Sequence, residues 1–320
     1  MKIGFIANPE SGKDIRRIVS DAFTFNNFEK LNIIKRIVRI ALSNESTEFV
    51  FMPELFGFGQ YTKEEFGDRI KILDFSPSGE SDTERAAALM AESGVCCIVT
   101  LGGDGTNRLV AKKAGSVPLI PVATGTNNAF PFTTDGSAVG MVLYAISKIG
   151  IKPSELKRQK RIEIFRGDEL IDIALVDVAV TAEEFVGSKA IFDVDKLREL
   201  FVTFSRWDKT GLSSIFAFSM PVGRDVPIGG HCVFDGNGRA VSAPILPGRL
   251  VQLRVRSLEK IPVNTSYRIK YVPSIIAADG ERIVKVDGDN FSVRITQNGP
   301  YVISVESVLE RACKEKVFLV

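Results

Sequence analysis

The sequence predicts two successive parts, an α/β half with a mostly parallel, doubly wound sheet over residues 1–150 and a β-rich half over residues 151–320. Three observations support this. Apolar strand-like runs alternate with helical patterns up to about residue 150, which is typical of βαβ units. Short segments of strand composition, separated by Gly, Pro, Asn and Asp, follow from Lys160 onward. A chain of 320 residues is also long enough for two hydrophobic cores.

The composition, with 45% hydrophobic and 25% charged residues, is that of an ordinary globular protein. A formal net charge of +2 gives no reason to expect nucleic acid or a membrane as partner. No apolar run approaches the roughly 20 residues that span a bilayer, and the N-terminus lacks a signal-peptide cleavage site. We therefore expect a cytoplasmic protein whose four cysteines are reduced thiols. The single histidine, His231, argues against a His-rich metal site and a Ser-His-Asp triad.

In the first half, apolar and β-branched residues run together in Val95–Leu101, which predicts a buried parallel strand. Val117–Ala123 repeats this pattern, and the other predicted strands are Lys2–Ala7, Glu48–Met52 and Arg69–Phe75. Helices are predicted over Phe28–Leu42, Ser81–Ser93, Asn107–Ala114 and Asp135–Lys148, with a loop and a short helical turn over Pro53–Gly67. The basic residues of the first helix, among them Lys30 and Lys35, are expected on a solvated face.

In the second half, only Lys189–Phe201 and Ser307–Lys314 look helical. Turn residues such as Asn237-Gly238 separate the predicted strands, which are Arg161–Arg166, Leu170–Thr181, Ser214–Met220, Gly230–Phe234, Leu250–Arg256, Tyr267–Val272, Arg282–Val286 and Phe291–Thr296. We place a domain boundary close to Ile151. The last helix and the apolar tail need a surface to bury against, so we expect the C-terminal segment to pack on the first half.

Polar loops follow three of the predicted parallel strands: Asn8–Lys13 (NPESGK), Gly102–Thr106 (GGDGT) and Thr124–Asn128 (TGTNN). In open α/β sheets, ligands bind beyond the carboxyl ends of the strands, so we expect one site with several walls. Candidate phosphate-binding residues are Asn8, Ser11, Gly12, Gly102, Gly103, Gly105 and Thr106. Candidate contacts to ribose or other hydroxyl groups are Thr124, Gly125, Thr126, Asn127 and Asn128.

The GGDGT loop combines glycines with one carboxylate, that of Asp104. Glycines let successive N–H groups turn toward an anion, and the helix that follows adds its N-terminal partial charge. This suits phosphate, which Asp104 itself would repel. The conflict is resolved if Asp104 accepts a proton from an attacking hydroxyl or meets the phosphates through Mg²⁺. The alternatives are a tight turn with Asp104 as a helix cap, and for TGTNN a turn with a left-handed Asn.

GGDGT, preceded by an apolar strand and by an NPxSG turn, resembles the NAD kinase/diacylglycerol kinase superfamily. VATGTNNAFPFTTDG is similar in placement to the NAD-kinase segment around its second glycine turn. Trp207–Phe218 resembles the TGSTAY-type loop, and ADGER at Ala278–Arg282 resembles the late DG(E/Q) element. Within the superfamily, the chain is most similar to the ATP-NAD-kinase-like X proteins of acetoin-catabolism operons. This similarity lies in the opening IANPESGKDIRR and in the long second half.

The resemblance implies an NAD-kinase-like fold, with a Rossmann-like first domain, a β-rich, β-sandwich-like second domain and an active site in the cleft between them. It implies ATP and Mg²⁺ as cofactors, NAD as a substrate and a homo-oligomer, a dimer or tetramer. Asp104 would be the base or a metal-linked carboxylate. Further substrate contacts would be Asp177, Thr210, Gly211, Ser213, Asp279 and Glu281, although a hairpin turn explains the Asp279-Gly280 pair equally well.

The chain departs from both branches of the superfamily. The Asn-Glu pair of NAD kinases appears as Val176-Asp177, and the lipid-kinase form GGDGTxNE is absent because Asn107-Arg108-Leu109 follows GGDGT. The leading hypothesis is a phosphotransferase that moves a phosphoryl group from ATP to a hydroxyl of NAD or a related small molecule. One alternative is a lipid kinase, whose apolar acceptor pocket only Leu55–Phe58 and Tyr61 support. Another is a non-catalytic protein that senses NAD or ATP for acetoin catabolism.

Overall fold

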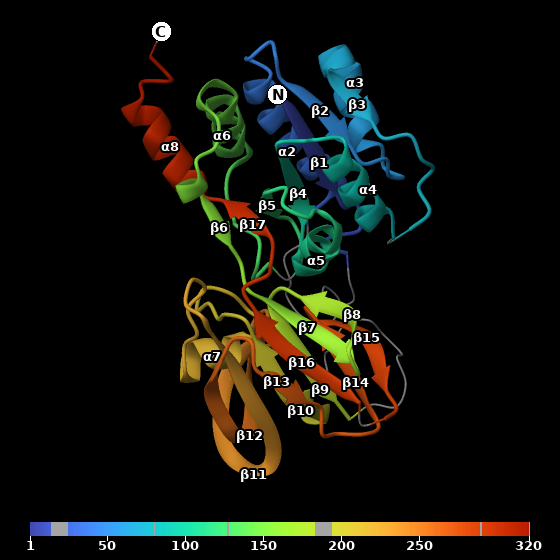
Figure 1. Ribbon diagram of the computed structural model, residues 1–320, viewed down its shortest axis with the longest axis vertical. Coiled ribbons are helices and arrows are strands. Elements are labelled where there is room, and N and C mark those ends of the chain that lie inside the picture. The colour runs from blue at the N-terminus through green and yellow to red at the C-terminus, as the bar shows by residue number, and fades with distance from the viewer. Residues whose placement is uncertain (14–24, 80, 127, 183–193, 289, 320) are drawn as a thin grey trace.

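The computed structural model describes residues 1–13, 25–79, 81–126, 128–182, 194–288 and 290–319. An α/β layer forms one end of the molecule, and two antiparallel sheets form the other (Figure 1). The helices of the first part surround its sheet, and the long β11–β12 hairpin, Ile228–Leu246 and Arg249–Pro262, extends from the opposite end.

The first sheet has seven strands in the order β3-β2-β1-β4-β5-β17-β6. All neighbours pair in parallel except β17 and β6, which pair antiparallel. The chain builds outward from β1 through β2 to β3 and then crosses to β4 and β5, so the order reverses between β1 and β4. This confirms the doubly wound sheet. The strands are β1 Lys2–Ala7, β2 Glu48–Phe51, β3 Ile70–Ile72, β4 Cys97–Gly102, β5 Leu119–Ala123, β6 Leu156–Arg158 and β17 Tyr301–Ile303.

Helices cover both faces of this sheet. One face is covered by α2 (Asn27–Ala41), α3 (Phe58–Phe66), α6 (Gly136–Ile149) and α8 (Val305–Lys314), whose apolar residues join Phe5 and Val99 in one core. The opposite face packs on α4 (Ser81–Glu92) and α5 (Asp104–Lys113), with Met90 and Val110 against Ile6 and Ile98. Over the described part of the chain, no helix combines the length and the apolar character that crossing a bilayer requires.

The second part is a β-sandwich, as expected. Its larger sheet has the order β12-β11-β10-β9-β14-β15 and its smaller sheet β13-β16-β7-β8. Ile164 and Val293 of the small sheet share a core with Val180 and Ile276 of the large one. The strands, besides the long hairpin, are β7 Arg161–Arg166, β8 Glu169–Ala174, β9 Asp177–Thr181, β10 Leu197–Val202, β13 Ser266–Arg268, β14 Ser274–Ala278, β15 Glu281–Val286 and β16 Phe291–Thr296.

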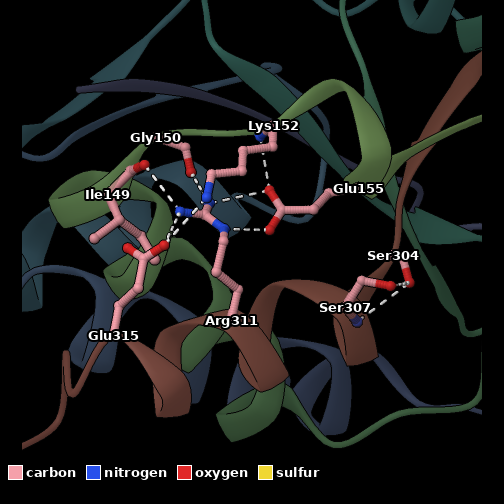
Figure 2. A network of polar contacts seen from close by, with 8 residues as sticks. All are labelled: Ile149, Gly150, Lys152, Glu155, Ser304, Ser307, Arg311 and Glu315. Atoms are coloured by element: carbon pink, nitrogen blue, oxygen red, sulfur yellow. Dashed lines mark hydrogen bonds and ion pairs between the residues drawn. The ribbon is translucent and has the colours of Figure 1, made fainter.

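The C-terminal segment returns to the first sheet through β17 and α8, and α8 packs against α6 (Figure 1). A polar network fixes it there (Figure 2). Arg311 of α8 donates from Nε and Nη2 to the Glu155 carboxylate, at 2.5 and 3.0 Å, and from Nη2 and Nη1 to the carbonyls of Gly150 and Ile149, at 2.7 and 3.2 Å. One guanidinium therefore satisfies the C-terminal carbonyls of α6 and a carboxylate in the 3₁₀ turn Pro153–Glu155. The predicted domain boundary near Ile151 lies in this segment and stays a prediction.

Three sequence-based assignments in the second half have the wrong type of structure, and Leu170–Thr181, predicted as one strand, forms the two strands β8 and β9. Ser214–Met220, predicted as a strand, forms helix α7 over Ser214–Ser219, because Ile215 and Phe216 pack as adjacent helical residues against β11. The described part of Lys189–Phe201, predicted as a helix, forms a 3₁₀ turn over Val194–Lys196 followed by β10. Asn237-Gly238, predicted as a turn, lies within β11 at a shift in its register with β12.

Candidate functional site

A cavity of about 710 Å³ lies at the carboxyl edge of the first sheet, beside the switch point between β1 and β4. All three polar loops contribute to its wall, together with the segments after β2 and β3 and the turn between β14 and β15. Predicted site residues that line it are Asn8, Ser11, Gly12, Gly103, Asp104, Gly105, Thr106, Gly125, Thr126, Asp279 and Glu281. A volume of this size is typical of sites for cofactors and small molecules.

The GGDGT and TGTNN loops touch through their backbones. A Cβ atom on Gly125 would lie 2.5 Å from the Gly103 Cα, and the Thr124 N–H donates to the Gly102 carbonyl at 3.2 Å. On Gly102, a Cβ would lie 2.4 Å from the Thr106 Cβ. Close approach of the chain, at the cavity wall for Gly103 and Gly125 and behind it for Gly102, therefore requires glycine at Gly102 and Gly125.

The Asn8–Gly12 loop holds the other two loops together. Asn8 donates from Nδ2 to Thr106 Oγ1 at 3.0 Å, and the hydroxyls of Ser11 and Thr124 lie 3.2 Å apart. Gly12 has a φ of +81°, and a Cβ on it would lie 3.1 Å from the Thr124 carbonyl oxygen. The polar side chains of Asn8 and Ser11 therefore position the GGDGT and TGTNN loops.

The basic residues of the first helix were expected on a solvated face, and for Lys30 this prediction is wrong. Its side chain is fully buried, and Nζ donates to the backbone carbonyls of Asn8, Pro9 and Ser11 at 3.0, 3.3 and 2.7 Å. Burial, and to a smaller extent the nearby charge of Lys13, lowers the pKa of Lys30 to about 8. The helical position of Lys30 alone does not show that a loop folds over it, so its burial could not be predicted from the sequence.

Asp104 is the first residue of helix α5 rather than part of a loop, and only 2% of it is exposed. Its Oδ1 accepts the Phe130 N–H at 2.8 Å and its Oδ2 accepts the Ala129 N–H at 3.2 Å. The carboxylate lines the cavity and also anchors the segment that follows TGTNN.

Arg224, from the loop between α7 and β11, supports this anchor. Its Nη2 donates to the Phe130 carbonyl at 3.0 Å, and Nε donates to Gln159 Oε1 at 2.6 Å. The guanidinium lies over the rings of Phe130, Phe132 and Phe204, at 4.9, 5.1 and 4.6 Å from their centroids. Burial lowers the pKa of Arg224 to about 10, so the group remains cationic at neutral pH.

Asp279 and Glu281 reach the cavity from the β14–β15 turn. Asp279 has a φ of +51°, and its Oδ1 accepts the N–H groups of Leu175, Val176 and Asp177 at 3.1, 2.7 and 3.2 Å. Burial raises the pKa of Asp279 to about 6, against the opposing effects of the Arg108 charge and these hydrogen bonds. The side chain thus fixes the crossing from β8 to β9 while facing the site.

Arg108, like Lys30 and Arg224, supports the site although no motif in the sequence marks it. It is buried in α5, and its Nη2 donates to Glu281 at 3.1 Å while Nη1 donates to Asp172 of β8 at 3.1 Å. Glu281 in turn lies over Gly105, where a Cβ would be 2.8 Å from its Oε1. The two ion pairs of Arg108 therefore join the GGDGT helix to the second half of the molecule.

Other cavity-lining residues come from segments that carried no clear motif. Glu54 accepts the N–H groups of Phe56, Gly57 and Phe58, and burial raises its pKa. Asp82 accepts N–H groups from Ser78 and Gly79. Apolar side chains, those of Met52, Leu55, Phe56 and Leu109, also line the cavity. The cavity wall therefore combines polar glycine-rich loops with apolar side chains.

Several predicted residues do not line the cavity. Gly102, Thr124 and Asn128 lie behind its wall, where Asn128 Oδ1 accepts the Gly125 N–H at 2.8 Å. Asp177 is buried at the start of β9. Thr210, Gly211 and Ser213 precede α7, where Gly211 N–H donates to the Pro244 carbonyl at 3.3 Å. Their role as substrate contacts stays a prediction, and Asn127 lies outside the described residues.

The described residues hold no group of three or more His, Cys, Asp or Glu side chains arranged for a metal ion. Asp104 is one of several carboxylate residues on the cavity wall, and oxygen ligands of this kind suit a divalent cation that would accompany bound phosphates. The helix N-terminus at Gly103 and Asp104 has the partial positive charge that favours an anionic group there.

Two family models match the chain in succession: the ATP-NAD kinase N-terminal domain over residues 3–149 and the acetoin catabolism protein X C-terminal domain over residues 160–298. Acetoin catabolism protein X of Cupriavidus necator is 32% identical over 305 residues, which cover 88% of this chain and 83% of that protein. The chain belongs to the acetoin catabolism protein X family. The resemblance to NAD kinases seen in GGDGT is thereby confirmed for the first half.

Two solved structures from Bacillus anthracis, both described as diacylglycerol kinases, align with 94% of this chain and with 97% and 96% of theirs. Their sequences are 14% and 13% identical to it, with TM-scores of 0.49 and 0.45. At this level the likeness carries no argument about the site.

Proposed function

We propose that this member of the acetoin catabolism protein X family is a phosphotransferase that moves a phosphoryl group from ATP to a hydroxyl of NAD or a related small molecule. The observation that carries the proposal is the position of Asp104, at the N-terminus of α5 and on the wall of a cavity formed by GGDGT and TGTNN. The family model for the ATP-NAD kinase N-terminal domain supports the same chemistry.

In this proposal, different residues of the cavity wall bind the phosphates and the acceptor. The backbone at Gly103–Gly105 and the dipole of α5 favour the phosphates, and Thr126 of the adjoining TGTNN loop also lines the cavity. Phosphoryl transfer depends mainly on positioning and electrostatic stabilisation, which a rigid wall of this kind provides. Mg²⁺, bound with the phosphates, would neutralise their charge beside Asp104.

Asp104 would act as the base. As the acceptor oxygen attacks phosphorus, the bond to the leaving diphosphate oxygen breaks, and the hydroxyl proton passes to Asp104. The N–H groups of Ala129 and Phe130 hold the carboxylate in one orientation. Such fixed geometry keeps the base within reach of a bound hydroxyl.

The test is phosphate transfer from radiolabelled ATP to NAD with Mg²⁺, comparing the wild type with Asp104→Asn. We expect the variant to lose turnover while circular dichroism shows a retained fold. Asp168→Asn, in an exposed turn, is the matched control and should keep wild-type activity. Unchanged turnover in Asp104→Asn would contradict the assigned mechanism.

A lipid acceptor is the second candidate, favoured by an exposed apolar cluster at the cavity mouth. Leu55 is 91% exposed, and Phe56 packs edge-on against Phe28, which is itself exposed, with ring centroids 5.5 Å apart. Thermal-shift measurements with NAD, NADH, ATP and diacylglycerol, followed by the transfer assay, separate the candidates. Stabilisation by diacylglycerol together with its phosphorylation supports the lipid kinase, whereas binding of NAD or ATP without transfer under any metal supports a sensor.

The cytoplasmic location and the homo-oligomer stay predictions. Sedimentation of the purified protein would test the second of them.

A further inference from the structure

Lys30 is an unusual lysine because none of its surface is exposed. It lies in the first turn of α2, where its positive charge does not benefit from the helix dipole. Taking an ammonium group out of water is strongly unfavourable unless other polar groups replace the water. A fully buried lysine at this place therefore requires a structural or functional reason.

The partners of Lys30 supply that reason. Its ammonium group contacts three backbone carbonyls of one loop, those of Asn8, Pro9 and Ser11, and also Asn27 Oδ1 at 3.3 Å. Three N–H donors are thus directed into a loop of carbonyl oxygens. Loss of the ammonium group would remove a charged donor from all three carbonyls, of which that of Asn8 also accepts the N–H and Oγ of Ser11 at 3.3 and 3.0 Å.

The shape of this loop decides the spacing of the cavity walls. Asn8 holds Thr106 of the GGDGT loop, and Ser11 holds Thr124 of the TGTNN loop. Residues of the Asn8–Gly12 loop line the cavity, with Lys30 on the other side of their carbonyls. A shift of this loop would separate the two walls that meet at Gly103 and Gly125.

We infer that Lys30 positions the Asn8–Gly12 loop and provides the positive charge with which this side of the cavity attracts a polyphosphate group. The inference rests on the proposed function only in taking the ligand to be a polyphosphate. It assigns a role in ligand binding to a residue that does not itself line the site.

The charges that face Lys30 make this role dependent on pH. Lys13 disfavours its charge, whereas Glu10 in the same loop and Glu54 beyond β2 favour it. With a pKa of about 8, Lys30 loses its proton in mildly alkaline solution, where exposed lysines keep theirs. The attraction for a polyphosphate should then weaken, and the neutral amine has fewer donors for the loop carbonyls.

The experiment measures the affinity of the full-length protein for Mg²⁺-tripolyphosphate by calorimetry between pH 7 and 9.5. The variant is Lys30→Met, which keeps the length of the side chain, and the matched control is Lys35→Met, whose lysine pairs with Glu65 near the surface. At pH 7 we expect Lys30→Met to bind about tenfold more weakly or worse, as for loss of a charged hydrogen-bonding group. Lys35→Met should bind as the wild type does.

The pH profile tests whether the protonated form of Lys30, rather than the length of its side chain alone, supports ligand binding. The ratio of the tripolyphosphate affinity of the wild type to that of Lys30→Met should fall as pH rises through about 8. Any of three results would overturn the inference. The wild type and Lys30→Met bind tripolyphosphate equally well at pH 7, the ratio of their affinities stays constant up to pH 9.5, or the wild type binds no tripolyphosphate. If Lys30→Met fails to fold, Lys30→Gln replaces it as the variant, and the wild-type affinity is measured against pH. A wild-type affinity that does not change with pH would overturn the inference. Normal tripolyphosphate binding without transfer to any alcohol contradicts the proposed function alone.

Discussion

Asp104 and Arg224 are connected through a single residue, Phe130. The Phe130 N–H donates to the Asp104 carboxylate, and the Phe130 carbonyl accepts from the Arg224 guanidinium. The proposed base belongs to the α/β half, whereas Arg224 comes from the β-rich half. The orientation of the proposed catalytic group is therefore set from both parts of the molecule.

Arg224→Met should lower turnover more than it weakens ATP binding. Methionine can still pack on the three phenylalanine rings but donates no hydrogen bond to Phe130, so the segment that holds Asp104 is less fixed. We expect kcat to fall at least about tenfold, since small misplacement of a catalytic group has effects of this size or larger. The KM for ATP should stay near the wild-type value in steady-state kinetics.

Arg224→Lys, which keeps the charge, should recover part of the lost turnover, and Arg249→Met on the exposed hairpin should lose none. A rise in KM with unchanged kcat would show instead that Arg224 serves substrate binding.

Gly125→Ala should disrupt the cavity. The added Cβ would lie 2.5 Å from the Gly103 Cα, and backbone cannot move aside as a flexible side chain can. We expect a loss of about 2 kcal/mol of stability, as for other overpacked sites, and loss of nucleotide-induced stabilisation in thermal-shift experiments. Gly236→Ala is the control, because nothing lies within 4 Å of its Cβ position. Nucleotide binding by Gly125→Ala at wild-type strength would rule out a requirement for this close contact.

The main architecture could be predicted from the sequence because it depends on local patterns. Continuous apolar runs such as Val95–Leu101 identify parallel strands, and the topology of such sheets places the following loops at one edge. GGDGT and TGTNN therefore fall together at the cavity, as expected.

The supporting residues could not be predicted in this way because they act over long sequence distances. Arg224 is recognisable only once Phe130, Phe132 and Phe204 surround it. Lys30 lies among basic residues that are partly exposed, and only the folded loop shows that it is buried. Ser214–Met220 has aromatic residues that favour a strand, yet packing on β11 selects a helix.

Asp279 should make stability depend on pH between about 4 and 7. Its pKa is 3.8 in the unfolded reference and about 6 in the fold, where burial disfavours the charged form. The corresponding stabilisation is present below the unfolded pKa and is lost as pH rises through about 6, an effect of about 3 kcal/mol. Chemical denaturation from pH 4.5 to 7.5 should show the wild type losing stability relative to Asp279→Asn. Parallel pH profiles would mean that Asp279 titrates normally.

Arg311→Met should destabilise the attachment of the C-terminal helix. The Glu155 carboxylate, only 3% exposed, would lose its guanidinium partner, and the carbonyls of Ile149 and Gly150 would lose their donor (Figure 2). Because an uncompensated buried charge is left behind, we expect unfolding free energy to fall by about 3 kcal/mol in urea denaturation. Lys152→Met removes a more exposed pair with Glu315 and should cost no more than about 1 kcal/mol. Equal, small effects of both substitutions would show that the Arg311 network does not hold α8 in place.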